Sequence, residues 1–419
     1  MKEVYIMEGA GKSLALVGGT AITPYRREDN CSLYLSGGQI SQMGQPDDVS
    51  IPENVRKINI EGKYVLPGFI DLHVHGGLGY DFSDDDPEAV NEISRFHARY
   101  GTTSLLATLY PQPMDKFLKK IKQIKAYCES APLHRNVEGI HLEGPFLNKE
   151  LHGAIRPDWM CPATLDNFNK LIDAGGSWIR VMTIAPETPG AMEVLRMAAL
   201  GKRKLIDDGG GRIYPLYLSI GHSKATYEEL SEAIDNGLEG VTHIFNAMPP
   251  IHHRKPGVLT GALLRDQLFV EVIADTVHVH PAVLRLLLKV KTADRILLIT
   301  DAIRAAGQPS GKYAFSGQEI EVRKGRAYLC SSPGTLAGST LNMGKAVRTM
   351  VVHGRATLEE AAQMASLNAA RVLAWKYRRG ILAVGKDADI AVLDDEFHVV
   401  MTIKRGHVIW SKEEGDIKN

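Results

Sequence analysis

The spacing of apolar residues along this 419-residue chain changes twice, near residue 62 and near residue 378. Before the first change, short apolar runs separated by turn residues predict β-strands at 13–17, 33–35, 40–43 and 57–60, with a hairpin turn at Gly37-Gly38. After the second change, the same pattern predicts strands within 385–393, 398–403 and 407–410. We expect the two ends to meet in one small β-sandwich domain, because the alternative of a separate tail would leave strand edges unpaired.

Between these ends, apolar runs rich in β-branched residues alternate with helical patterns. The runs predict eight strands, at 64–75, 102–109, 137–143, 179–185, 216–221, 240–245, 269–274 and 296–300. The helical patterns predict helices at 86–100, 225–236, 281–290 and 357–374. The first begins at Asp86-Pro87, an N-cap followed by a proline, and the last begins at a Thr357 capping box.

This alternation sets the predicted fold class. Strands that alternate with helices form a parallel sheet, and eight of them over roughly 300 residues favour a (β/α)8 TIM-type barrel over a doubly wound sheet. The fold class is therefore α/β. We expect the barrel at 63–377 and the small β-domain at 1–62 and 378–419.

Composition excludes several classes of protein. The 49 basic and 49 acidic residues give a net charge of zero, so no overall field attracts nucleic acid or an acidic membrane surface. The four cysteines form no Cys-x-x-Cys pair, which argues against a disulfide framework and is typical of a reducing compartment. Neither a signal-peptide core nor an apolar run of about 18 residues is present, so we expect a cytoplasmic protein without a membrane span.

A histidine pair ends the first predicted barrel strand. His73 and His75 are two residues apart, so in a strand both imidazoles project from the same face. Neutral imidazoles aimed at one point suit a borderline metal ion such as zinc. Alone, the pair could equally be two surface histidines, and its meaning depends on the rest of the chain.

Other reactive side chains also fall at the ends of predicted strands. They are Glu143, His222, His243, Asp275 with His278, and Asp301. Taken singly, each carboxylate could cap a helix and each histidine could belong to the core. Barrel enzymes, however, build their active sites at the carboxyl ends of the strands. Together, four histidines and two carboxylates predict a site for one or two divalent ions with a position left for water.

Eight motifs along the chain carry a family resemblance. They are Pro67-Gly-Phe-Ile-Asp-Leu-His-Val-His-Gly-Gly77, His141-Leu-Glu-Gly-Pro-Phe-Leu147, Ala185-Pro-Glu187, Gly221-His-Ser223, Thr242-His-Ile-Phe-Asn-Ala-Met248, Ile273-Ala-Asp275, Thr300-Asp-Ala302 and Leu336-Ala-Gly-Ser339. In this order they resemble the N-acetylglucosamine-6-phosphate deacetylase family, a branch of the amidohydrolase superfamily. The family uses a glutamate where many related enzymes use a carboxylated lysine, and Glu143 is similar to that glutamate.

The resemblance implies a metal-dependent hydrolase. Glu143, His222 and His243 would hold the main ion, and His73 and His75 would complete a second site that shares Glu143. Some members of the family lack this histidine pair and use one metal, so both one and two ions per chain stay open. Zinc is the expected ion, and iron, manganese or cobalt are the alternatives.

Asp301 would be both a metal ligand and the catalytic residue in this family. It would act as general base while water activated by the metal attacks the acetamide, and then as general acid toward the leaving amine. N-acetyl-D-glucosamine 6-phosphate would give D-glucosamine 6-phosphate and acetate.

The resemblance also implies how an amino-sugar phosphate is bound. The phosphate would be held by Arg254, His278, Asn246 and the backbone of Ala247, with Arg254 reaching in from the neighbouring subunit of a homodimer. An arginine fork can donate two hydrogen bonds to a phosphate. Two further residues, Ala154 and Leu336, would also contact the substrate.

One position departs from the family pattern. Ile155 follows Gly153-Ala154 where the family usually has a histidine that helps to hold the substrate, and its side chain cannot form a hydrogen bond. His152 or Arg156 would have to take over that contact. The alternative substrate is therefore N-acetylgalactosamine 6-phosphate or another N-acyl compound. A non-catalytic homologue is a remote alternative, because such a chain would be expected to have lost Asp301 or a metal ligand.

Overall fold

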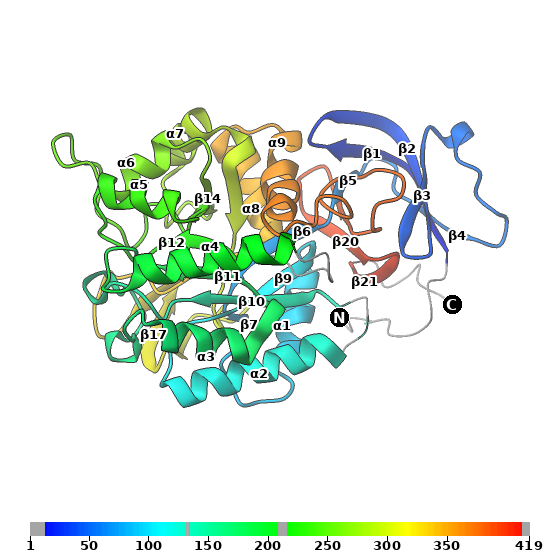
Figure 1. Ribbon diagram of the computed structural model, residues 1–419. Helices are drawn as coiled ribbons and strands as arrows, with labels where there is room; N and C mark the ends of the chain where they lie inside the picture. The colour runs from blue at the N-terminus through cyan, green and yellow to red at the C-terminus, as the bar shows by residue number, and fades with distance from the viewer. Residues whose placement is uncertain (1–12, 131, 133–134, 208–215, 413–419) are drawn as a thin grey trace.

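The protein is described by a computed structural model, in which residues 13–130, 132, 135–207 and 216–412 can be placed (Figure 1). The outer ends of the predicted small domain, 1–12 and 413–419, lie outside these residues. No helix in the described ranges combines the length and the apolar character needed to cross a bilayer.

Eight parallel strands form the central sheet in sequence order. They are β6 (Phe69–Val74), β9 (Thr102–Leu109), β10 (Val137–Glu143), β11 (Ile179–Ile184), β12 (Tyr217–Ile220), β13 (Gly240–Val241), β14 (Phe269–Ile273) and β15 (Ile296–Ile299). The sheet closes where Val74 pairs with Ala302 and the Asp301 N–H donates to the His73 carbonyl oxygen at 2.8 Å. The side chains of the eight strands are almost all buried, as expected for strands covered by helices. The predicted barrel is confirmed.

Helices surround the barrel (Figure 1). They are α1 (Ala89–Ala98), α2 (Met114–Ser130), α3 (Leu165–Gly175), α4 (Ala191–Asp207), α5 (Tyr227–Asp235), α6 (Val258–Leu264), α7 (Pro281–Lys291), α8 (Met343–Thr349), α9 (Leu358–Ala362) and α10 (Asn368–Val372), with π-helical segments η6 (Met350–Gly354) and η7 (Gln363–Leu367). The Thr357 capping box is present, because Thr357 and Glu360 each accept the other's backbone N–H. α1 begins two residues later than predicted: Asp86 accepts the Glu88 N–H in a turn, and the first helical residue is Ala89 rather than Pro87.

Both ends of the chain contribute to a second sheet. Its order is β21-β20-β19-β5-β1-β2-β3, with β4 paired to β1. The strands are β1 (Leu14–Thr23), β2 (Arg26–Ser36), β3 (Gln39–Gly44), β4 (Arg56–Asn59), β5 (Tyr64–Pro67), β19 (Ile390–Leu393), β20 (Val399–Lys404) and β21 (His407–Ser411). N-terminal and C-terminal strands thus lie side by side, beside the barrel (Figure 1). The predicted β-domain built from both termini is confirmed.

The single strand predicted at 64–75 is wrong, because the chain changes sheet within it. β5 pairs with β1 and β19, whereas β6 belongs to the barrel. Gly68 separates the two, and a Cβ atom there would lie 2.3 Å from the Thr103 side chain. Only glycine allows this close approach. We propose Gly68 as the point where the small domain passes into the barrel.

A small antiparallel sheet lies between β15 and α8, and the sequence patterns did not predict it. It consists of β16 (Gly311–Phe315), β17 (Gln318–Arg323) and β18 (Arg326–Leu329). Its apolar face packs against the loop after β10, in a cluster that includes Leu147, Ile155 and Phe315. This sheet therefore forms part of the wall above the barrel's carboxyl end.

An ion cluster joins the small domain to the barrel. The Lys404 ammonium on β20 is fully buried, 2.5 Å from Glu138 on β10 and 2.9 Å from Asp389. Arg379 pairs with Glu138, Asp387 and Asp389. Burial would raise the pKa of Glu138, but the charges of Arg379 and Lys404 outweigh it and lower the pKa to about 2.

We expect Lys404→Met to destabilise the protein by about 3–5 kcal/mol, because it leaves the buried carboxylate of Asp389 and the mostly buried one of Glu138 with one cation fewer. Thermal unfolding followed by circular dichroism measures this loss. Lys116→Met on α2, where the lysine is exposed, is the matched control and should leave the midpoint unchanged. Equal midpoints for the two variants would show that the cluster does not hold the domains together.

Candidate active site

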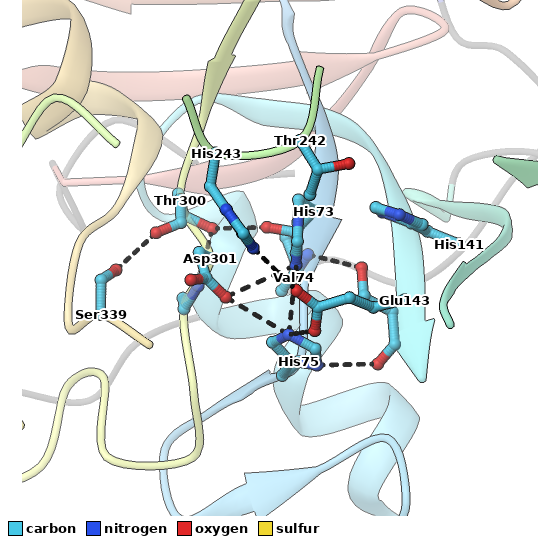
Figure 2. Close-up of polar contacts among 12 residues, drawn as sticks. His73, Val74, His75, His141, Glu143, Thr242, His243, Thr300, Asp301 and Ser339 are labelled. Carbon is cyan, nitrogen blue, oxygen red and sulfur yellow. Dashed lines mark hydrogen bonds and ion pairs between the residues drawn. The ribbon is translucent and has the colours of Figure 1, made fainter. Parts of the chain in front are cut away.

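Six side chains converge where the barrel strands end. His73 lies on β6 and His75 follows it, while Glu143 is the last residue of β10. Two further histidines, His222 and His243, each lie two residues beyond a strand, after β12 and β13. The sixth side chain, Asp301, lies two residues beyond β15. Figure 2 shows His73, His75, His243, Glu143 and Asp301 pointing toward one another.

Glu143 is shared by two groups of donor atoms. Its Oε1 lies 3.1 Å from the Nε2 atoms of both His222 and His243, which are 3.2 Å apart. Its Oε2 lies 3.2 Å from His75 Nε2, which is 3.2 Å from His73 Nε2. One carboxylate therefore joins two histidine pairs.

These spacings fit metal ions. Ligands about 2.0–2.1 Å from a tetrahedral zinc ion lie about 3.3 Å from one another, close to the separations around Glu143. The Nδ1 atoms, on the other side of the imidazole rings, lie close to backbone carbonyl oxygens. His75 Nδ1 lies 3.2 Å from the Thr108 carbonyl oxygen, and His222 Nδ1 lies 2.8 Å from that of Leu151. Because a carbonyl only accepts, each of these rings carries its proton on Nδ1 when it is neutral, and Nε2 is left for a metal.

Asp301 lies beside both groups. Its Oδ1 is 3.3 Å from His75 Nε2 and 3.5 Å from His73 Nε2. Its φ of 49° is left-handed, as are those of His222 (48°) and His243 (30°). Such backbone costs energy and persists only where neighbouring contacts hold it. The Ser339 N–H supplies one of these contacts, donating to the Asp301 carbonyl oxygen at 2.8 Å.

The surroundings of the two acidic groups set their protonation. Burial would raise the pKa of Glu143, but the His73 charge and hydrogen bonds from His222 and His243 hold it well below its ordinary value. Burial would also raise the pKa of Asp301, but the neighbouring His73 and His75 outweigh it and lower the pKa below its ordinary value. Both groups therefore favour the ionised form that binds metals.

Behind the site, Asp71 ties the first barrel strand to the last. Its Oδ2 accepts the Thr300 hydroxyl at 2.6 Å, and its Oδ1 accepts the backbone N–H groups of Thr300 and His73, both at 3.2 Å. Burial raises the pKa of Asp71 to about 7. The contact fixes the segment that carries Asp301 relative to the one that carries His73.

The donor atoms face a cavity of about 280 Å³. The expected substrate residues Ala154, Asn246, Ala247, His278 and Leu336 all line it. His278 Nδ1 lies 2.7 Å from Asp275 Oδ2, which acts as acceptor and fixes the ring. The roles of these residues stay predictions.

Arg254 is not brought into this cavity. It lies on an exposed loop, where its Nη1 is 2.9 Å from His253 Nε2. Within one subunit, the expected phosphate contact of Arg254 is therefore not made.

Ile155 lines the cavity as an apolar residue. Arg156 and His152, which were expected to replace the histidine, make other contacts instead. Arg156 pairs with Asp158 at 2.7 Å, and His152 Nδ1 donates to the Ile155 carbonyl oxygen at 2.9 Å. Neither of them lines the cavity in the described structure.

Sequence reasoning missed several contributors. Glu187 accepts the Ser223 hydroxyl and the Lys224 N–H, both at 2.7 Å, and so anchors the loop after His222. The Ala185-Pro-Glu187 motif was the available signal. Phe315 lines the cavity from β16, and no sequence signal linked it to the site. A buried glutamate within β14, Glu271, contacts His73 Nδ1 at 3.2 Å.

Comparison with known proteins identifies the family. The model of the amidohydrolase family matches residues 64–409. The chain belongs to the amidohydrolase family. This confirms the resemblance inferred from the motifs, and together with the His/Glu groups it indicates a divalent metal.

Individual relatives of this amidohydrolase are similar over nearly their whole length. The N-acetylglucosamine-6-phosphate deacetylase of Lysinibacillus sphaericus is 35% identical over 94% of this chain and 97% of its own. The N-acetylgalactosamine-6-phosphate deacetylase of Escherichia coli O157:H7 is 34% identical over 88% and 92%. A solved structure of a variant N-acetyl-D-glucosamine-6-phosphate deacetylase from Mycobacterium smegmatis, in complex with N-acetyl-D-glucosamine-6-phosphate, is 29% identical, with a TM-score of 0.86 over 96% of this chain and 100% of its own.

We expect Glu143→Gln to lose metal from both groups of donors, because both depend on this carboxylate. Elemental analysis after dialysis against metal-free buffer measures the ions per chain. Glu228→Gln on α5 is exposed and is the matched control, which should keep the wild-type content. A Glu143→Gln variant with that content would contradict the shared-ligand geometry.

Proposed function

We propose that this amidohydrolase removes the acetyl group of N-acetyl-D-glucosamine 6-phosphate, giving D-glucosamine 6-phosphate and acetate. The observation that carries the proposal is the convergence of Asp301 and two Glu143-linked histidine pairs on one cavity. The names of several relatives, similar over nearly the whole chain, support the same substrate. One or two zinc ions per chain, a homodimer and a cytoplasmic location belong to the proposal, with iron, manganese or cobalt as the alternative ions.

The proposed chemistry divides between the metal and the chain. Glu143, His222 and His243 would hold one divalent ion, and His73, His75 and the same Glu143 would hold the other. When bound there, such ions lower the pKa of water and polarise an amide carbonyl. Asp301 accepts a proton from the attacking water and returns it to the amide nitrogen, since an amine leaves readily only once protonated.

The proposed reaction also requires residues that bind the phosphate group of the substrate. Asn246, the Ala247 backbone and His278 line the cavity, and Asp275 fixes the His278 ring so that Nε2 is free to contact the ligand. Arg254 is exposed, and in the proposal it reaches the cavity of a neighbouring subunit. Its guanidinium would add a charge-assisted contact to the phosphate.

A second candidate substrate is N-acetylgalactosamine 6-phosphate. The observation that favours it is Ile155, which gives the cavity an apolar wall where the family usually has a hydrogen-bonding histidine. A relative of 34% identity also carries the name of that activity. The non-catalytic alternative has no such support.

A substrate panel separates these candidates. We expect acetate release from N-acetylglucosamine 6-phosphate to exceed that from unphosphorylated N-acetylglucosamine by at least about 100-fold in kcat/KM, because loss of the phosphate leaves the polar groups that would hold it unpaired. N-acetylgalactosamine 6-phosphate is the third compound, assayed with the same metal-loaded enzyme. A preference for it would replace the first substrate with the second.

We expect Asp301→Asn to lower kcat by about 10²–10⁴-fold, because an amide cannot shuttle the proton. Acetate release is measured alongside metal content, so that a loss of ions is distinguished from a loss of proton transfer. Asp235→Asn, an exposed residue at the end of α5, is the control. A metal-loaded Asp301→Asn enzyme with the wild-type rate would exclude the general-base role.

A further inference from the structure

Glu271 is a buried carboxylate that the catalytic scheme above does not use. It lies in the middle of β14, is 1% exposed, and is flanked along the strand by Val270 and Val272. Interiors of such barrels are normally filled by branched apolar side chains, which would fit here without the cost of burying a charge. Its presence therefore requires a compensating contact.

Its contacts lead to both histidine pairs. Glu271 Oε2 lies 3.2 Å from His73 Nδ1 and accepts the backbone N–H of His243 at 3.3 Å. The other oxygen, Oε1, has no hydrogen-bond partner among the described residues. Within those residues, His73 is also its one ion-pair partner, and no lysine or arginine offsets its charge.

This support distinguishes His73 from the other histidines of the site. Carbonyl oxygens hold Nδ1 of His75 and His222, and Nδ1 of His243 has no partner in the described part of the chain. Only His73 is backed by a carboxylate. A carboxylate behind a metal-binding histidine fixes the tautomer, orients the ring and makes the opposite nitrogen a better ligand.

His141 is close enough to suggest a different arrangement, a metal held by His73, His141 and Glu271. Both His141 nitrogens are already engaged, however, at 2.9 Å from the Leu72 carbonyl oxygen and 2.8 Å from the Thr183 hydroxyl. Glu271 therefore acts on the metal centre through His73 rather than as a ligand itself.

We propose that Glu271 is a positioning residue for the ion held by His73 and His75. It presents His73 Nε2 to that ion and supplies the negative charge that makes the two-ion state stable, while the ion at His222 and His243 depends on it less, because Glu271 contacts the His243 backbone N–H and not the imidazole. This inference rests on the proposed two-metal function and identifies the residue that determines whether the second position is filled.

Two variants separate the effect of the Glu271 charge from that of its hydrogen-bond acceptor. Glu271→Gln keeps an oxygen that can accept from His73 and His243 but removes the charge, and Glu271→Ala removes both. Apo full-length protein is titrated with zinc against a competing chelator, and the affinity of each ion is measured. We expect the second ion to bind about 10-fold more weakly in Glu271→Gln and about 100-fold more weakly in Glu271→Ala, with a smaller loss of affinity for the first ion.

Three comparisons test whether the effect passes through His73. His73→Asn should bind one ion, and adding Glu271→Gln to it should cause no further change. Glu138→Gln removes a buried carboxylate from the ion cluster between the domains; it should lower stability but keep both ions. In cobalt-loaded protein, the visible absorption of the second ion should change in Glu271→Gln and stay unchanged in Glu138→Gln.

Several results would overturn the inference. They are an unchanged second-ion affinity in both Glu271 variants, equal weakening of both ions, a further loss in the His73→Asn background, or unfolding of both variants by circular dichroism. A wild-type chain that binds one ion would also overturn it, yet leave the deacetylase proposal intact. A wild-type chain that binds none would overturn the proposed function itself.

Discussion

The site depends on the sharing of one buried carboxylate, Glu143, between two pairs of histidines. The two oxygens of Glu143 lie 3.1–3.5 Å from the Nε2 atoms of His73, His75, His222 and His243, and all five side chains are buried. Such an arrangement is unfavourable by itself and becomes favourable when cations bind between the donors. Much of the surrounding structure can be understood as the support that keeps these atoms in place before an ion arrives.

That support is distributed over several barrel strands. Asp71 joins the first and last strands, Glu187 anchors the loop after β12, and carbonyl oxygens orient individual imidazole rings. Left-handed backbone at His222, His243 and Asp301 is held by the same contacts. Rigid support of this kind fixes a site more closely than flexible loops would. The metal centre is therefore a property of the whole carboxyl end of the barrel rather than of its ligands alone.

Sequence patterns were informative where reactive side chains stand at the ends of regularly spaced apolar runs. Reactive residues at the ends of apolar runs predicted the barrel and the residues that meet at its carboxyl end, because parallel strands end on one side of a barrel. The change of sheet at Gly68 left no such signal, since the apolar pattern continues across it. Phe315 reaches the cavity through a small sheet that no local pattern connects to it. Glu271 did leave a signal, a single carboxylate inside an apolar run, but its meaning required knowing which histidine lay opposite.

The pairing of β5 with β19 has a consequence for the order of assembly. β5 leads through Gly68 directly into the strand that carries His73, and its partner β19 follows the whole barrel in the chain, with Ile390 paired to Pro67. During synthesis the barrel's first strand therefore emerges long before β19, the strand that pairs with the segment leading into it. The segment that carries His73 and His75 therefore gains its full support only once synthesis has passed β19, so a rigid metal site requires residues from both sides of the barrel in the chain order.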